Sequence, residues 1–437
     1  MNNIYKKYDL SDAVINLVND ASDELSETYK EYEKNKEINQ IKVIHAMQKN
    51  NLAASDFYYA TGYGYGDIGR DKIEEIFKDI FNAEDALVRT SIVSGTHAIY
   101  IMLSSILDHG DEFIYVTGTP YDTIQKSIGL IGDLRDSLMK KGIMYSQVEL
   151  KGATIDFEAL ESKITKNTKA IVVQRSIGYE FRKAINLHTI KDDMLKFKEK
   201  HPDIVIMYDN CYGEFTDSIE PTDIGADIIA GSLLKNLGAG ISLGGGYLVG
   251  RKDLIELAAD RLYAPGLGKE LGLSYGTLRT TLQGLYMSPR VVCEALKTQS
   301  LFSYVFTKLG FECTPEFNEH KSDIVCAIKF KDPDILIKFC KSIQKAACVD
   351  SFLTPEPWDM PGYENKIIMA SGSFIDGSSI EISADGPIRE PYIAYFQGSM
   401  SLEQGKLGLM IALQDLVDAG KISLQQNISK IKVLERI

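Results

Sequence analysis

The sequence predicts an α/β fold, with a large domain built on a mostly parallel β-sheet and a smaller α+β domain after it. Two observations support this prediction. Short apolar runs alternate with amphipathic helical stretches between residues 86 and 250, as in parallel sheets with helical crossovers. These runs also lack alternating polar positions, which is typical of strands covered on both faces.

An amphipathic helix over residues 11–48 comes first. Ser11 can cap its first turn, and apolar residues recur at three-and-four spacing opposite a face rich in Glu and Lys. These apolar residues are Val14, Leu17, Val18, Ala21, Leu25, Tyr29 and Tyr32. We assign residues 1–50 to an N-terminal helical arm, which packs either on its own domain or against a partner subunit.

The large domain spans residues 51–265 and carries the alternating strands and helices. Its strands are predicted at residues 86–93, 112–116, 169–174, 204–208, 228–230 and 246–249, and its helices at 96–108, 156–165 and 188–200. Ligands of such sheets bind at the carboxyl ends of the strands. We therefore expect the functional residues to follow these predicted strands.

The smaller α+β domain spans residues 266–437. Residues 251–310 are predicted to be mainly helical, with a break at the Gly-rich segment 264–268. Strands are then expected at 322–330 and 380–384, with a helix at 333–346. This mixture of elements indicates a second domain with its own sheet.

The composition excludes several classes of function. The 437 residues are 44% hydrophobic and carry a net charge of −13, with a pI of about 5.1. Such an acidic chain is a poor partner for nucleic acid or an acidic membrane, because neutralising phosphates needs a basic face. The first residues lack the apolar region of a signal peptide, and no run approaches the ~20 apolar residues that span a bilayer. We expect a cytoplasmic protein.

Cysteine and histidine are not spaced as in a metal site. The six cysteines are scattered without a Cys-x-x-Cys pair, as reduced core residues usually are. The six histidines are dispersed, and none belongs to a His-Glu-x-x-His motif. We therefore predict no metal site.

The most informative residue is Lys235, which follows one short apolar strand, while Asp209 ends an earlier one. A lysine and an acid in these places suit pyridoxal 5'-phosphate (PLP). The amine forms a Schiff base with the aldehyde, and the carboxylate keeps a proton on the pyridine nitrogen.

Phosphate binding is predicted at Ser94, Gly95 and Thr96, which end a strand and open a helix. Backbone N–H groups and the helix dipole favour an anion there, although an ordinary capped turn is the alternative. Ser232 lies three residues before Lys235, so its hydroxyl can reach a phosphate while the lysine reaches the aldehyde. We interpret neighbouring His97 as a packed residue.

Two further residues are candidates for contacts with flat or carboxylate groups. Tyr121 follows a strand at the same edge of the sheet, where its ring could stack on a cofactor or merely occupy a turn. Arg389 lies in a Pro-bounded turn of the second domain. It could bind a substrate carboxylate through two hydrogen bonds, or be a surface Arg paired with an acid.

The segment Gly64–Gly69 matches the dinucleotide pattern Gly-x-Gly-x-x-Gly, but residues 53–60 before it make a poor buried strand. A nicotinamide site is therefore disfavoured. Tyr63 and Tyr65 in this loop are instead candidate phenol donors to a phosphate.

Together these motifs resemble fold-type I PLP-dependent enzymes, specifically the cystathionine/methionine γ-lyase group and its aluminium-resistance branch. The segments that carry the resemblance are residues 62–67, 94–99, 174–176, 208–215, 231–236 and 383–389. The resemblance covers nearly the whole chain. It implies a PLP-dependent transferase-like fold with a seven-stranded sheet in the large domain.

The resemblance also implies roles for single residues. Lys235 would carry PLP, Asp209 would face the pyridine nitrogen and Tyr121 would stack on the ring. Gly95, Thr96 and Ser232 would hold the phosphate, together with Tyr63 or Tyr65 from a neighbouring subunit. Arg389 would bind the substrate carboxylate. Family members are homotetramers built from dimers that share active sites.

The predicted activity is that of a carbon–sulfur lyase acting on a sulfur amino acid. Lys235 would abstract the α-proton, and a thiol would leave from Cβ or Cγ. The alternatives are transamination, racemisation or aldol chemistry on the same scaffold, or a protein that binds PLP without catalysis. Product analysis separates them, because a lyase releases ammonia and a thiol.

Overall fold

The structure, a computed structural model of the chain, describes residues 2–424. It divides into a larger unit of residues 37–289 and a smaller unit that joins residues 1–36 to residues 290–437. These bounds differ from the predicted segments 1–50, 51–265 and 266–437, which stay predictions about domains. Each bound of the units falls inside a long helix, either α3 (Ser26–Lys49) or α10 (Leu278–Lys308), so no break in the sequence marks it.

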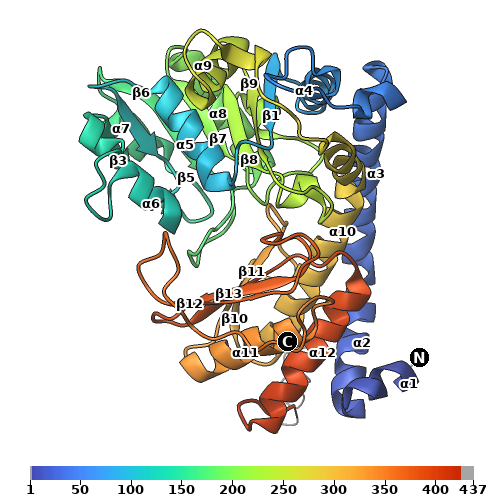
Figure 1. Cartoon of the computed structure of the whole chain (residues 1–437). Coiled ribbons are helices and arrows are strands. Elements are labelled where there is room, and N and C mark those ends of the chain that lie inside the picture. The colour runs from blue at the N-terminus through green and yellow to red at the C-terminus, as the bar shows by residue number, and fades with distance from the viewer. Residues whose placement is uncertain (1, 425–437) are drawn as a thin grey trace. The chain divides into compact units, whose positions relative to one another are not determined.

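The larger unit contains a seven-stranded sheet in the order β1-β9-β8-β7-β6-β2-β3 (Figure 1). Its strands are β1 (Asp85–Arg89), β2 (Glu112–Tyr115), β3 (Met144–Gln147), β6 (Thr168–Gln174), β7 (Val205–Asp209), β8 (Ile228–Ser232) and β9 (Gly246–Gly250). Neighbouring strands are parallel, except that β9 runs antiparallel to β1 and β8. The predicted mostly parallel, seven-stranded sheet is confirmed.

The central strands are buried along their whole length, since every residue of β7, β8 and β9 is buried. That is the property expected of strands covered on both faces. The edge strand β3 was missing from the prediction because its residues are exposed or half-buried and form no apolar run. A short hairpin, β4 (Leu150–Lys151) and β5 (Thr154–Ile155), follows it.

Helices surround this sheet. They are α4 (Ile68–Ile80), α5 (Gly95–Ile106), α6 (Asp122–Ile128), α7 (Phe157–Lys163), α8 (Leu187–Lys200) and α9 (Lys252–Leu262). The apolar side chains of α5 and α9 join those of the strands in one buried cluster. The predicted helices at 96–108, 156–165 and 188–200 therefore lie where the sequence placed them, within one to two residues.

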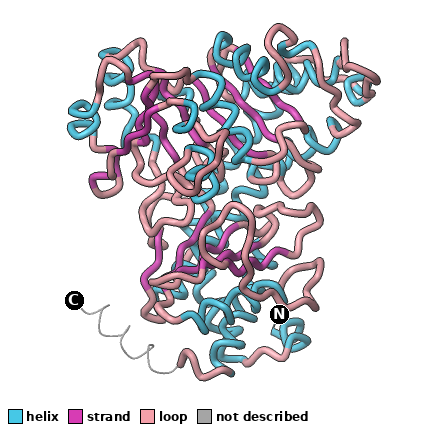
Figure 2. The backbone as a smooth tube through the Cα atoms, turned by 60° about the vertical axis from the view of Figure 1, so that its left-hand side comes forward, coloured by secondary structure: helices cyan, strands magenta, loops and turns pink. Residues whose placement is uncertain are grey.

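The smaller unit has its own five-stranded antiparallel sheet, in the order β10-β11-β14-β13-β12. These strands are β10 (Glu312–Thr314), β11 (Val325–Lys329), β12 (Ile367–Ser371), β13 (Ser383–Pro387) and β14 (Ile393–Gln397). Helices α11 (Pro333–Lys345) and α12 (Leu402–Asp418) pack against each other, and α11 covers the sheet. Figure 2 shows the strands of each unit gathered together with helices around them. The predicted α+β character of the second domain is confirmed.

The predicted N-terminal helix is nearly continuous. A short helix, α1 (Asn2–Tyr5), precedes α2 (Asp12–Glu24) and α3, and only Leu25 separates the last two. The face of α2 that carries Val14, Val18 and Ala21 is buried in the apolar cluster of the smaller unit. The α2 part of the arm therefore packs on its own chain.

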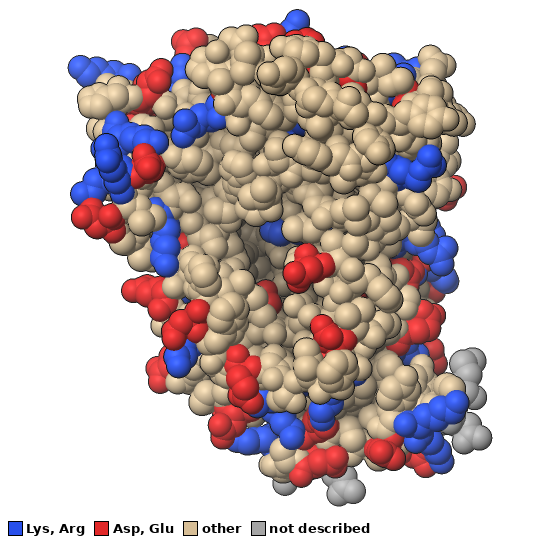
Figure 3. Space-filling view, viewed as in Figure 1, with Lys and Arg blue, Asp and Glu red and all other residues tan. Residues whose placement is uncertain are grey.

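Charged side chains are interspersed around the rims on the face drawn in Figure 3, and the middle of the larger unit presents mainly uncharged residues. Among residues 2–424, no helix combines the length and apolar character needed to cross a membrane.

Candidate active site

Predicted site residues from three separate segments meet at one edge of the sheet. Asp209 ends β7, Ser232 ends β8, and Gly95 opens α5. A Cβ atom built on Gly95 would lie 3.5 Å from the Ser232 Cβ and 3.7 Å from the Lys235 Nζ. It would lie only 3.1 Å from the Sγ of Cys211. The absence of a side chain at Gly95 thus leaves a space beside the Lys235 amine.

Lys235 is half-buried, and its Nζ lies 4.0 Å from the centre of the Tyr212 ring. Burial alone lowers the pKa of the Lys235 ammonium, but Cys211, Tyr212, Asp209 and Glu214 together raise it above its usual value. The face of the Tyr212 ring and the carboxylate of Asp209 favour the charged amine, whereas Cys211 and Glu214 contribute only when they are ionised. The free protein therefore holds Lys235 as an ammonium at neutral pH.

Asp209 is the only predicted acid at this edge, and its side chain is buried. One of its carboxylate oxygens accepts a hydrogen bond from the Cys211 N–H at 3.1 Å. Burial raises the pKa of Asp209, and the positive charges of Lys235 and Arg182 oppose that rise. A further cation near this carboxylate, such as a protonated pyridine nitrogen, would offset the cost of its burial.

The first turn of α5 offers donors for a phosphate. The Ser94 Oγ caps the helix by accepting the His97 N–H at 3.1 Å. The N–H groups of Gly95 and Thr96 come before the first bonded turn of this 12-residue helix, so they can donate to an anion. The Ser232 Oγ accepts the Leu234 N–H at 3.1 Å and keeps a hydroxyl proton to donate.

Tyr121 is placed next to this turn by hydrogen bonds. Its N–H donates to the Oε1 of Gln174 at 2.8 Å, and its ring lies 5.2 Å from that of Tyr179. The hydroxyls of Thr96 and Thr123 are 2.6 Å apart and join the start of α5 to α6, which Tyr121 precedes. The start of α5 is thus joined to the helix that Tyr121 precedes, and the stacking role of Tyr121 stays a prediction.

Tyr63 and Tyr65 lie elsewhere in the larger unit. Their side chains are 77% and 64% exposed, and their ring centres are 6.1 Å apart. Arg389 belongs to the smaller unit, where its backbone N–H donates to the backbone carbonyl of Pro387 at 2.9 Å. The roles predicted for these three residues stay predictions.

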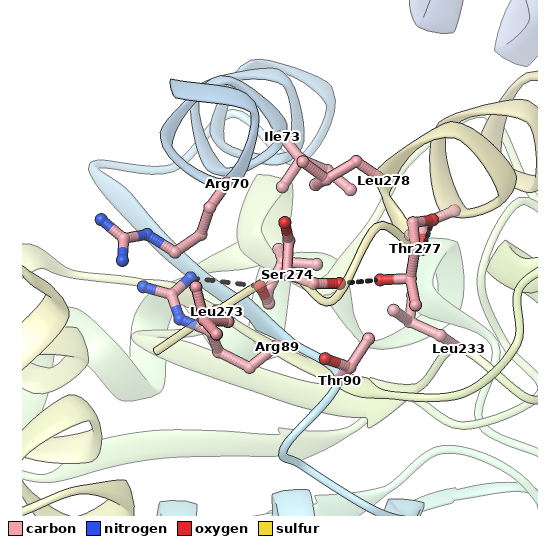
Figure 4. A pocket seen from close by; sticks show the side chains of 11 residues that line it. Arg70, Ile73, Arg89, Thr90, Leu233, Leu273, Ser274, Thr277 and Leu278 are labelled. Atoms are coloured by element: carbon pink, nitrogen blue, oxygen red, sulfur yellow. Dashed lines mark hydrogen bonds between the residues drawn. The ribbon is translucent and has the colours of Figure 1, made fainter. Parts of the chain in front are cut away.

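The Gly-x-Gly-x-x-Gly segment has no strand before it: residues 54–57 form a single 3-10 turn and residues 58–67 are irregular. Asp67 caps α4 by accepting the Arg70 N–H at 3.1 Å. Next to it lies a cavity of about 20 Å³, lined by Arg70, Arg89 and Thr90 among others (Figure 4). Such a volume holds a single water molecule, not a cofactor.

Within residues 2–424, one cluster of possible metal-ligating atoms occurs, at Glu33, Cys293 and Glu294 of the smaller unit. The Lys297 ammonium forms ion pairs with both carboxylates. A side chain thus supplies positive charge to both acids.

Sequence reasoning gave no role to Cys211, Tyr212 or Glu214. The structure places all three around Lys235, where each affects the pKa of its amine. The available signal was their position directly after the end of a buried strand, the place where ligands of parallel sheets bind.

The fold is that of the fold-type I PLP-dependent enzymes. The PLP-dependent protein YhfS from Escherichia coli has the same fold, with a TM-score of 0.56 and 15% identity over 89% of this chain and 97% of that one. The chain belongs to the methionine gamma-lyase family, which it matches over residues 14–417. The predicted carbon–sulfur lyase is thereby confirmed, and PLP is the cofactor that the family implies.

Solved structures from clostridia are much more similar. A carbon–sulfur lyase involved in aluminium resistance from Clostridium novyi NT is 43% identical, with a TM-score of 0.90 over 95% of this chain and 98% of that one. A proposed cystathionine beta-lyase involved in aluminium resistance from Clostridium acetobutylicum is 41% identical, with a TM-score of 0.91 and the same coverage. The predicted resemblance to the aluminium-resistance branch is confirmed.

Proposed function

We propose that this lyase uses PLP to cleave a carbon–sulfur bond of cystathionine or a similar sulfur amino acid. The observation that carries the proposal is the meeting of Lys235, Ser232 and the side-chain-free Gly95 at the strand ends, beside Asp209. The naming of the Clostridium acetobutylicum relative supports cystathionine and elimination at Cβ. The same residues would also serve elimination at Cγ.

The residues present fit PLP. The cofactor, when bound, supplies an aldehyde for the substrate amine and an electron-accepting ring. Asp209 would hold a proton at the ring nitrogen, and Tyr121 would contact the ring. The N–H groups of Gly95 and Thr96 and the hydroxyl of Ser232 would bind the phosphate. Ser94 would support them by capping the same turn.

Lys235 is the group proposed to move protons. As a neutral amine it would take the proton from the substrate Cα. The same group, now an ammonium, can return a proton to a neighbouring carbon or to the departing thiolate. The products would be a thiol, a keto acid and ammonia, and the Lys235 Nζ is among the three atoms nearest a Cβ built on Gly95.

The remaining roles are proposed from the family resemblance. Arg389 would bind the substrate carboxylate with two parallel hydrogen bonds. The exposed rings of Tyr63 and Tyr65 support contact with a second copy, whose phosphate site one of them would complete. We propose a homotetramer of dimers that share active sites. The six free cysteines support a reducing, cytoplasmic setting.

The test uses the purified protein and two variants, Lys235→Ala and Lys235→Arg. The wild type should absorb as a PLP protein, keep the cofactor after borohydride, and release thiol from cystathionine. Lys235→Arg keeps a positive charge but has no primary amine, so it should lose covalent attachment as Lys235→Ala does. Pyruvate identifies β-elimination of cystathionine, and 2-oxobutyrate identifies γ-elimination of methionine. Thiol release at the wild-type rate by Lys235→Ala would overturn the assignment.

A further inference from the structure

Glu214 is a buried acid next to the reactive lysine that the proposed mechanism does not use. Its side chain is 0% exposed, and its Oε1 accepts a hydrogen bond from the Tyr247 hydroxyl at 2.7 Å. Its Oε2 has no hydrogen-bond partner among the described residues. A buried carboxyl with one oxygen unpartnered is costly as an anion, so its charge depends on its neighbours.

Tyr247 is rigidly held, which fixes the carboxyl. It lies on β9 opposite Gly231 of β8, and a Cβ on Gly231 would come within 2.5 Å of the Tyr247 hydroxyl. Only glycine therefore allows the hydroxyl to pass across β8 to Glu214. The carboxyl is thus oriented by a tyrosine of β9 whose hydroxyl crosses β8, the strand that leads to Lys235.

Glu214 is also tied to the residue that follows Lys235. The Asn236 side-chain amide donates to the backbone carbonyl of Glu214 at 2.9 Å. The Ser288 hydroxyl donates to the backbone carbonyl of Asn236 at 2.7 Å. Electrostatically, Lys235 lowers the pKa of Glu214, and Glu214 raises the pKa of Lys235. The charges of the two groups are therefore linked.

We propose that Glu214, oriented by Tyr247, is a positioning residue that controls the protonation of Lys235. Its ionised form holds Lys235 as an ammonium, and its protonated form leaves the amine freer to react. The inference rests on the proposed function, in which Lys235 is the amine that binds PLP.

Glu214 is expected to titrate near neutral pH, and burial also raises the pKa values of the buried acids Glu220 and Asp209. Burial raises the pKa of Glu214 to about 8, the hydrogen bond from Tyr247 opposes this rise, and the charge of Glu220 adds to it. Burial holds the pKa values of the Cys211 thiol and the Tyr247 phenol well above their usual range, so both stay neutral. Glu220 forms an ion pair with Arg175, and the guanidinium of Arg175 keeps its charge over this pH range.

The test follows attachment of PLP to the protein freed of cofactor, by absorbance between pH 6.5 and 9.5. Wild type and Glu214→Gln should attach PLP at the same rate below about pH 7, where both residues are neutral. Above about pH 8 the variant should attach it roughly tenfold faster, which corresponds to a shift of one unit in the pKa of Lys235. A constant ratio of rates at every pH would overturn the inference, because it would indicate a merely structural role.

Two further variants keep the test decisive. Tyr247→Phe removes the hydrogen bond that favours the ionised acid, so its rates should depart from the wild type from about pH 7 upwards, as the acid stays protonated. If Glu214→Gln does not fold, Tyr247→Phe tests the inference by itself. Glu381→Gln alters a buried acid of the smaller unit and should leave the attachment rates unchanged.

The outcomes separate this inference from the proposed function. If the wild type attaches no PLP at Lys235, the proposed function fails. If it attaches PLP there and both Glu214→Gln and Tyr247→Phe follow its pH profile, only the role of Glu214 fails.

Discussion

The Lys235 ammonium lies 4.0 Å from the centre of the Tyr212 ring. Tyr212 adopts a positive φ of 69°, an uncommon backbone state for a residue with a large side chain. Outliers of this kind persist where the surrounding structure holds them and often lie at functional sites. The turn after β7 thus presents an aromatic face to the amine.

Replacing Tyr212 tests this contact. Tyr212→Phe keeps the ring face and should retain most of the activity. Tyr212→Leu removes the face that would stabilise the ammonium formed when Lys235 takes the substrate proton. It should therefore lower kcat about tenfold, since a cation–π contact is worth roughly 1–2 kcal/mol when partly desolvated. Steady-state thiol release measures both. Equal kcat values for the two variants would mean that the ring does not act through its face.

Gly95→Ala should weaken PLP binding. The added Cβ would lie 3.1 Å from the Cys211 Sγ and would occupy the space beside the Lys235 amine. Crowding of this kind costs typically 1–3 kcal/mol, which corresponds to about a tenfold or greater rise in the Kd for PLP. Spectroscopic titration of the protein freed of cofactor measures the Kd. Adding Cys211→Ala should recover much of the loss, and a double variant as weak as the single one would rule out this clash as the cause.

One of the two exposed tyrosines should contribute to PLP binding across subunits. Tyr63→Phe and Tyr65→Phe each remove one hydroxyl, and the one that reaches a neighbouring phosphate should raise the Kd about tenfold, as loss of a hydrogen bond to a charged group does. Tyr59→Phe, also 64% exposed, is the matched control. Unchanged PLP affinity in both variants would exclude the shared site.

Arg389→Lys should raise KM for the substrate and leave PLP affinity unchanged. Lysine keeps the charge but cannot make two parallel hydrogen bonds to a carboxylate, so a rise in KM of about tenfold or more is expected. The control is a substrate analogue that has the amine but lacks the carboxylate. Its KM should be the same for the wild type and Arg389→Lys, because the contact under test is absent. If Arg389→Lys has the wild-type KM, the residue does not bind the substrate carboxylate.

The sequence could predict the strands of the sheet and the residues at their ends. Buried runs such as Ile204–Tyr208 are continuous and apolar, and parallel connections bring their carboxyl ends to one edge. In the structure Ser232, Lys235 and Gly95 lie close together after these strands, and the roles predicted for them stay predictions. The edge strand β3 was missed because half-exposed residues form no such run.

The turn after β7 could not be predicted in the same way. Tyr212 and Phe215 both have positive φ values, of 69° and 60°, and neither is a residue type that signals this state. An acid such as Glu214 is also expected to be exposed. Its burial depends on Tyr247 from a distant strand, a contact that local patterns do not reveal.

That burial makes stability depend on pH. The pKa of Glu214 is about 8 in the folded chain and near its ordinary value of 4.5 in the unfolded chain. Between these values only the folded state binds the proton, so Glu214 makes stability fall as pH rises, by about 1.4 kcal/mol per pH unit.

Glu214→Gln cannot ionise and should lose this slope. Unfolding midpoints of the two proteins, freed of cofactor and compared from pH 5 to 7.5, should therefore diverge in favour of the variant as pH rises. Other acids with raised pKa values, such as Glu381, are present in both proteins and cancel in the difference. Parallel curves would show that Glu214 is ionised in the folded protein throughout this range.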